Sequence, residues 1–307
     1  MDLSVIVPVF NESEVLPQLR ARLEPVLSSC TPDYEILFIN DGSTDGTLPL
    51  LKTWAHQDKR IKIISLSRNF GKEAAVTAGL AAGSGRAVII LDADLQDPPE
   101  LIHEFWKKFQ EGYDNVYGVR ENRSADSFLK RTSAQAFYKF YNRLSNSSIP
   151  YNAGDYRLLS RRAVNAVLAL PERERFMKGL FSWVGYKSVA VPFTREKRAA
   201  GKTKWSYWKL WNFALNGLTA STTLPLKLWT YFGLVISAAS FLFAAWTAYK
   251  KIVFGNPVSG YTSIMVAILF FSGVQLISLG VIGEYLSHIF HEVKQRPAYF
   301  IDEKINL

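Results

Sequence analysis

Cysteine is almost absent from this 307-residue chain, in which Cys30 is the single example. An intramolecular disulfide and a metal cluster held by several thiolates are therefore excluded, and we expect the polar part of the chain to occupy a reducing compartment. The N-terminus also lacks a signal-peptide pattern, because Met1-Asp2 leads directly into a short apolar run that stops at Pro8. We expect the first domain to remain in the cytoplasm.

Charge is absent from two long apolar runs in the last third of the chain, Leu228–Tyr249 and Ile252–Gly283. Each run reaches the roughly 20 residues that a helix needs to cross the hydrocarbon core. The connector from Lys250-Lys251 to Tyr261 contains the turn residues Gly255 and Pro257, so the pair predicts a helical hairpin with both termini on one side of a membrane. The basic tail segment Lys294–Arg296 predicts that this side is the cytoplasm.

The net charge of +9 favours anionic partners such as phosphates, acidic lipid headgroups or nucleic acid. No recognised nucleic-acid module occurs, which disfavours the third class. Basic residues instead precede a segment in which Trp205, Trp208, Trp211, Leu215 and Leu218 recur every three to four positions. This spacing predicts an amphipathic helix in the headgroup region, with packing against the soluble domain as the alternative.

Short β-branched runs alternate with longer helical stretches in the first part of the chain. The runs are Leu3–Val9, Tyr34–Asn40, Ile61–Ser67, Ala87–Asp92 and Asn115–Val119. They are apolar almost throughout, as expected of strands buried on both faces of a parallel sheet with helical crossovers. We predict an α/β domain with a doubly wound, mostly parallel sheet, in which ligands bind beyond the carboxyl ends of the strands.

The loop after the fourth run carries two carboxylates, Asp92 and Asp94. Carboxylate oxygens at such a position can hold Mg²⁺ or Mn²⁺ against a diphosphate, whereas an isolated Asp-x-Asp is usually a solvated turn. Asp41 follows the second run and can accept hydrogen bonds from a base or a ribose, with a helix cap as the alternative. Gly201-Lys202-Thr203 is not a phosphate-binding P-loop, because Glu196 stands where that motif requires glycine.

Five segments carry a wider resemblance. They are Val7–Glu12, Asn40–Asp45, Arg68–Glu73, Asp92–Glu100 and Gly154–Leu159. Together they resemble family 2 glycosyltransferases of the GT-A fold, and more closely the polyprenyl-phosphate glycosyltransferases, over essentially the whole chain. The segment Phe176–Leu180, the segment Gly201–Lys204 and the C-terminal apolar pair are most similar to bactoprenol glucosyltransferases of the O-antigen-modifying type, which are related to dolichyl-phosphate mannose synthases.

The resemblance implies inverting transfer of one hexose, with UDP-glucose as donor and undecaprenyl phosphate as acceptor. It assigns nucleotide-sugar binding to Pro8, Asn11, Glu12, Asp41, Lys72, Asp92 and Gln96. It assigns a divalent metal, Mg²⁺ or Mn²⁺, to Asp92, Asp94 and Gln96, and catalytic roles to Asp155 and Asp94. Asp155 is either a base or an orienting residue, because a phosphate acceptor is already anionic near neutral pH.

The acceptor phosphate needs cationic side chains near the membrane edge, since arginine offers paired donors and lysine a point charge. The candidates are Arg120, Arg123, Arg131, Arg157, Arg198, Lys202 and Lys204, with Lys130 in the same segment. An electrostatic tether to anionic lipids is the alternative role for each of them.

The expected organisation is a cytoplasmic catalytic domain over residues 1–195 and a basic linker with a juxtamembrane helix over 196–225. Membrane helices follow at 226–250 and 263–287, joined by a periplasmic connector at 251–262, and a cytoplasmic tail spans 288–307. These assignments place the chain in the bacterial inner membrane. We expect a separate flippase and a second transferase as partners, with homo-oligomerisation open.

Alternative functions remain at this point. GDP-mannose, UDP-galactose or a modified aminosugar nucleotide are alternative donors. A processive polysaccharide synthase is disfavoured because such enzymes carry a Gln-x-x-Arg-Trp element, and no Arg-Trp pair occurs here. A non-catalytic membrane scaffold is the alternative of another class, and the joint presence of Asp41, Asp92, Asp94 and Asp155 argues against it.

Overall fold

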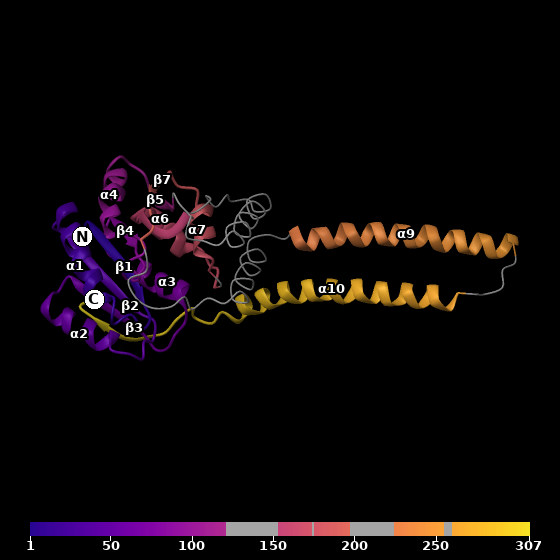
Figure 1. The fold of residues 1–307 in the computed structure, drawn as a ribbon, viewed down its shortest axis with the longest axis horizontal. Helices are drawn as coiled ribbons and strands as arrows, with labels where there is room; N and C mark the ends of the chain where they lie inside the picture. The colour runs from indigo at the N-terminus through magenta and orange to yellow at the C-terminus, as the bar shows by residue number, and fades with distance from the viewer. Residues whose placement is uncertain (121–152, 174, 197–223, 255–259) are drawn as a thin grey trace. The chain divides into compact units, whose positions relative to one another are not determined.

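The computed structural model describes residues 1–120, 153–173, 175–196, 224–254 and 260–307. The chain forms two compact units (Figure 1). One comprises Met1–Trp211 together with Gln295–Leu307, and the other comprises Asn212–Lys294.

An eight-stranded mixed sheet forms the centre of the first unit, in the order β7-β5-β6-β4-β1-β2-β3-β8. Its strands are β1 (Leu3–Val9), β2 (Tyr34–Asn40), β3 (Ile61–Leu66), β4 (Ala87–Ile90), β5 (Asn115–Arg120), β6 (Ala153–Ser160), β7 (Ser188–Phe193) and β8 (Ile301–Ile305). Strands β1 to β4 are mutually parallel, whereas β6 is antiparallel to β4 and β5, and β8 is antiparallel to β3. The predicted doubly wound, mostly parallel GT-A sheet is confirmed.

Helices cover both faces of this sheet. They are α1 (Leu16–Cys30), α2 (Thr47–Gln57), α3 (Lys72–Ala82), α4 (Ile102–Gln110), α6 (Arg161–Ala169) and α7 (Met177–Trp183), with a short 3₁₀ turn η1 (Pro99–Leu101) before α4. Buried residues of α1, α2 and α4 form one hydrophobic cluster with the sheet, and those of α3, α6 and α7 form the other.

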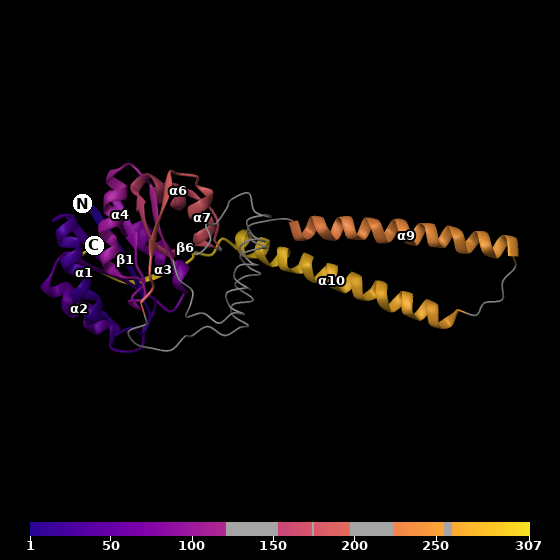
Figure 2. The same ribbon diagram turned by 45° about the horizontal axis from the view of Figure 1, so that its top comes forward.

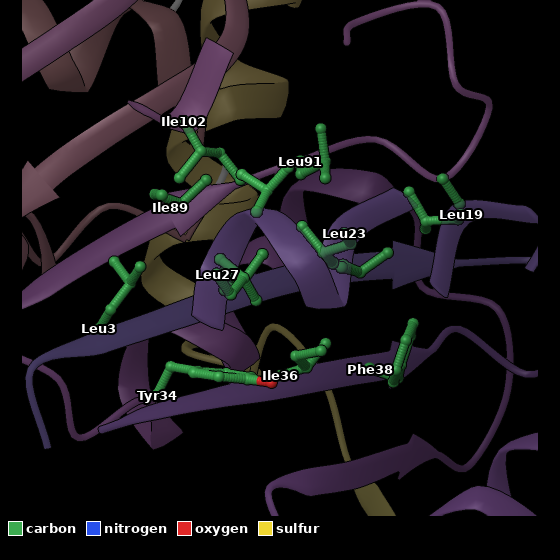
Figure 3. Packing of buried hydrophobic residues seen from close by; sticks show 14 of the residues in the cluster. Leu3, Leu19, Leu23, Leu27, Tyr34, Ile36, Phe38, Ile89, Leu91 and Ile102 are labelled. Carbon is green, nitrogen blue, oxygen red and sulfur yellow. The ribbon is translucent and has the colours of Figure 1, made fainter. Parts of the chain in front are cut away.

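The burial of β2 on both faces explains why most of its sequence is apolar. Tyr34, Ile36 and Phe38 belong to the cluster with α1, and the intervening Leu37 and Ile39 belong to the cluster with α3. Successive side chains of a strand point to opposite faces, so a strand covered on both sides is apolar at most positions rather than at alternate ones. Figure 3 shows the α1 side of this packing around β1, β2 and β4. Each large side chain buried there contributes about 1.5–3 kcal/mol to folding.

The C-terminal segment differs from the simple tail expected over 288–307. Helix α10 continues to Lys294, and β8 then joins the edge of the catalytic sheet, with Ile63 paired to Ile305 (Figure 1). Asn306 closes the strand by donating from Nδ2 to the carbonyls of Ala55 and Ile61 at 2.7 and 2.9 Å. The five-residue strand Ile-Asp-Glu-Lys-Ile has three charged residues, so no hydrophobic run in the sequence predicts it.

The second unit contains two long helices that contact each other, α9 (Leu224–Phe254) and α10 (Tyr261–Lys294) (Figure 2). Within the part of the chain that the structure describes, Val266–Lys294 is long and apolar enough to cross a membrane by length and composition. Trp229–Phe243 is a shorter apolar stretch of the same kind. The predicted Trp-rich helix and the connector residues 255–259 lie outside the described residues.

Candidate active site

Four parallel strands bring their carboxyl ends to one edge of the sheet, and polar side chains follow each of them. Asn11 follows β1, Asp41 follows β2, Lys72 follows β3, and Asp92 follows β4. Asp155 reaches the same edge from the antiparallel strand β6. Because Ile90 of β4 pairs with Arg157 of β6, two further residues along each strand place Asp155 opposite Asp92. The structure thereby brings together residues that the sequence assigned separately.

Lys72 is the first residue of α3, and its ammonium bridges two carboxylates. Its Nζ lies 2.7 and 2.8 Å from the two carboxylate oxygens of Asp92 and 2.7 Å from Oδ2 of Asp155. Burial of the ammonium opposes its charge, but the carboxylates of Asp155 and Asp92 outweigh that effect and raise the lysine pKa. The stem is partly accessible, with 39% of the side chain exposed, while the ammonium lies between the two acids. Lys72 is therefore a fixed cation.

Asp155 interacts with a second lysine. Lys178 Nζ lies 3.7 Å from Oδ1 of Asp155, on the carboxylate oxygen that Lys72 does not contact. Burial favours the neutral acid, but the Lys178 and Lys72 cations outweigh it and lower the pKa of Asp155 below its ordinary value. A carboxylate held in this way is a weak proton acceptor, which favours an orienting role over a base role.

Asp41 fixes the loop that leads into α3. Its two oxygens accept the backbone N–H groups of Phe70 and Gly71 at 2.7 and 2.9 Å. Burial raises the pKa of Asp41, and these two hydrogen bonds oppose that shift. The neighbouring Gly42 has φ +69°, and a Cβ there would lie 2.5 Å from the Arg68 carbonyl carbon. Only glycine fits this close approach of two loops.

The loop after β1 is joined to the loop after β2. Asn11 has φ 55° and accepts the Thr44 N–H on Oδ1 at 2.8 Å, while its own N–H donates to Ser43 Oγ at 3.0 Å. The Glu12 N–H donates to Thr47 Oγ1 at 3.0 Å. Pro8 lies near the end of β1, opposite Ile39 of β2. The roles of these residues in nucleoside binding remain predictions.

The turn after β4 carries a cluster of acids. Asp94 Oδ1 accepts the Gln96 N–H at 3.1 Å, and Leu95 between them has φ 55°. Asp97 is buried, and this burial, with the nearby Asp92 and Asp94 carboxylates, raises its pKa to about 6 against the opposing charges of Arg120 and Arg195. Asp97 was not among the predicted site residues, although it lies in the Asp92–Glu100 segment.

The acid residues suit a divalent cation held jointly with a diphosphate. Asp92 and Asp94 offer hard oxygen ligands, and Mg²⁺ in such sites is typically bound by one or two carboxylates plus substrate phosphates. Among the described residues, no group of three or more His, Cys, Asp or Glu side chains is arranged to hold a metal by itself. The donor set therefore fits a metal that binds together with an anionic substrate.

Two of the predicted acceptor residues lie within the described residues. Arg120 ends β5 beside the start of β6, where its Nη2 lies 3.8 Å from the position of a Cβ on Gly154. Arg157 is buried, donates to the Gly154 carbonyl at 2.9 Å and stacks over Phe181 at 4.2 Å. Burial lowers its pKa to about 10. This placement favours support of Asp155 from within the domain over contact with an acceptor phosphate.

The other predicted acceptor residues lie outside the described residues. They are Arg123, Arg131, Arg198, Lys202 and Lys204, together with Lys130. Lys178 and Glu73 were not among the predicted site residues. Both stand in segments quoted for the resemblance, but their meeting at Asp155 depends on the packing of α7 against α3 and β6.

An α/β sheet with carboxylates and a bridging lysine at the carboxyl edge of its parallel strands defines a class, the GT-A glycosyltransferases. The chain belongs to glycosyl transferase family 2, which it matches over residues 4–168, and residues 224–289 match the GtrB C-terminal hairpin. The protein is a glycosyltransferase.

Two full-length relatives and one solved structure are similar to the chain. An uncharacterized glycosyltransferase of Synechocystis sp. is 52% identical over 99% of this chain and 95% of its own length. The SfII prophage-derived bactoprenol glucosyl transferase of Shigella flexneri is 48% identical over 98% of this chain and 97% of its own length. A mannosyltransferase from Pyrobaculum calidifontis, solved with GDP-mannose and Mn²⁺, is 15% identical over 96% of this chain and 88% of its own, with a TM-score of 0.48.

Proposed function

We propose that this protein transfers a single glucose from UDP-glucose to undecaprenyl phosphate with inversion at the anomeric carbon. The observation that carries the proposal is the row of charges at the sheet edge, in which Lys72 joins Asp92 to Asp155. The near full-length similarity to a bactoprenol glucosyl transferase supports the choice of sugar and lipid.

In the proposed reaction, a phosphate oxygen of the acceptor attacks the anomeric carbon of the donor. The bond between that carbon and the β-phosphate oxygen breaks, and its electron pair leaves with the nucleoside diphosphate. Asp41, with Pro8, Asn11 and Glu12, holds the nucleoside. Asp92 and Asp94, with Gln96 beside them, would hold a divalent cation, which would neutralise charge on the diphosphate. Lys72 adds a fixed positive charge at the same place.

No protein base is required for this step. A phosphate monoester has a second pKa of about 6, so the attacking oxygen is already anionic at neutral pH. Asp155 remains ionised between Lys72 and Lys178 and keeps both ammonium groups oriented. The acceptor phosphate becomes a phosphodiester, and the donor becomes a nucleoside diphosphate. This reaction balances without a proton transfer.

The sheet topology supports a membrane hairpin with a catalytic unit on one side. β1 precedes the two apolar helices in the chain and β8 follows them, yet both strands belong to one sheet. The chain must therefore cross a membrane an even number of times between them. Because the α10 segment Val266–Lys294 is long enough to cross, α9 supplies the return crossing. We place the catalytic unit and both termini in the cytoplasm of a bacterial inner membrane, where a flippase and a second transferase would use the product.

The test is sugar transfer by the full chain purified in detergent. Labelled UDP-glucose and undecaprenyl phosphate are supplied with Mg²⁺ or Mn²⁺, beside GDP-mannose, UDP-galactose and an aminosugar nucleotide. We expect organic-phase label from UDP-glucose that requires the metal, disappears in Asp94→Asn and persists in Asp302→Asn, an exposed β8 control. Label from another donor alone would overturn glucose, and absence of transfer from every donor would favour the scaffold function.

A further inference from the structure

The ammonium groups of Lys72 and Lys178 lie on opposite oxygens of one carboxylate, that of Asp155. Lys72 contacts Oδ2 at 2.7 Å, and Lys178 approaches Oδ1 at 3.7 Å. With Asp92 on the far side of Lys72, the order of charges is Asp92, Lys72, Asp155, Lys178. The four groups alternate in sign along the mouth of the site.

The two lysines differ in how many of their ammonium donors remain available for a hydrogen bond. A lysine ammonium has three donors and no acceptor. Lys72 lies within 2.8 Å of three carboxylate oxygens, two on Asp92 and one on Asp155, so its donors are used. Lys178 has one carboxylate oxygen at 3.7 Å, which is longer than a hydrogen bond, and 23% of its side chain is exposed. Oδ1 of Asp155 is correspondingly buried without a hydrogen bond among the described residues.

The backbone that carries Lys178 is firmly held. Its neighbours Met177 and Phe181 are each 2% exposed and belong to the hydrophobic cluster with α3 and α6. The Met177 backbone also hydrogen-bonds the Glu73 carboxylate, which stands next to Lys72 on α3. A lysine on a fixed backbone, whose ammonium makes no hydrogen bond to a described residue, suits a phosphate that arrives from outside.

We propose that Lys178 is the ligand of the acceptor phosphate and that Asp155 is the positioning residue that holds it. This inference rests on the proposed function and deepens it. The donor diphosphate belongs at the Asp92 end, next to Lys72. An inverting displacement requires attack from the side opposite the leaving group, and Lys178 is the cation on the other side of Asp155. Lys72 thus acts on the departing phosphate through its charge alone, and Lys178 binds the attacking phosphate through its ammonium donors.

The test separates the affinities for the two substrates. In Lys178→Met we expect the acceptor KM to rise about tenfold or more, because a hydrogen bond to a charged group is lost. The donor KM and the Kd for UDP remain within about threefold of wild type, because Lys72 and the Asp92 loop are untouched. Lys178→Arg keeps the charge and restores the acceptor KM to within about threefold. Lys187→Met, an exposed lysine before β7, is the matched control and leaves both values unchanged.

Two further measurements ensure that the test gives a result even if one variant misfolds or no sugar is transferred. Lys178→Gln is measured beside the Met variant and retains a polar side chain, so that misfolding of one protein, detected as lost UDP binding, does not end the test. Binding of undecaprenyl phosphate in micelles is compared between wild type and each variant without any donor. Weaker lipid binding by the variants supports the role of Lys178 even if no sugar is transferred. Equal lipid binding, or a donor KM that rises as much as the acceptor KM, overturns it.

Discussion

Lys72 and Asp155 are 83 residues apart in the chain, yet their Nζ and Oδ2 atoms lie 2.7 Å apart. The contact joins the first turn of α3 to the start of β6 and connects the two sides of the site. The Asp92 carboxylate forms an ion pair with the same ammonium. The position of Lys72 is therefore set by two acids, one in the turn after β4 and one in the adjacent antiparallel strand β6.

Loss of this cation is expected to stop the reaction. In Lys72→Met, we expect kcat to fall by about 10²–10³-fold, the range seen when one preorganised electrostatic contact to a developing charge is removed. Two partly buried carboxylates also lose their partner, so the thermal midpoint falls. Transfer assays and thermal unfolding in detergent measure the two effects, with Lys187→Met as the control. A kcat within threefold of wild type would show that Lys72 plays no part in the chemistry.

Asp41 offers a test of the donor loop. In Asp41→Asn one carboxylate oxygen becomes an amide NH₂ that faces a backbone N–H of Phe70 or Gly71. A buried donor left without an acceptor costs about 1–3 kcal/mol. We expect a lower thermal midpoint from this cost, and about tenfold weaker UDP binding because an amide is a weaker hydrogen-bond acceptor for the nucleoside than a carboxylate. Calorimetric titration of UDP checks this, and unchanged binding in a destabilised variant would restrict Asp41 to a structural role.

The fold was more predictable than the site, for a physical reason. Strands such as β2 are buried on both faces, so their sequence is mostly apolar and predicts a buried strand. Lys178 has no such local signal, because its contact with Asp155 arises from the packing of α7, and the pairing of β8 depends on a short charged segment. Asp41 and Asp92 could be predicted as candidate site residues because the carboxyl ends of parallel strands meet at one edge of a sheet.

The raised pKa of Glu73 predicts that the stability of the protein depends on pH. Burial and the nearby Asp155 raise its pKa from 4.5 to about 7, although Lys72 and Lys178 oppose the shift. Arg157 is the other charged group near it. Because the folded-state pKa lies above the unfolded value, ionisation of Glu73 disfavours the folded state increasingly from about pH 4.5 to pH 7.

Glu73→Gln removes that titration while keeping the shape of the side chain. The thermal midpoint of the variant, relative to wild type, should therefore rise between pH 5 and pH 8. Unfolding scans at matched ionic strength measure this difference, and Glu111→Gln on the exposed end of α4 is the control. A difference that stays constant or falls with pH would contradict the raised pKa of Glu73.

The C-terminal segment contacts the loop that leads into α3 at the site. The Ser67 N–H donates to the Phe300 carbonyl at 3.0 Å, and the rings of Phe70 and Phe300 lie 6.4 Å apart. Phe70 in turn donates its N–H to Asp41. Removal of residues 300–307 leaves the edge of β3 unpaired and frees this loop. We expect a lower thermal midpoint and weaker UDP binding, whereas the Asp302→Asn control keeps both, since its side chain is exposed. If the shortened chain unfolds earlier but binds UDP as tightly as wild type, β8 stabilises the sheet without shaping the donor loop.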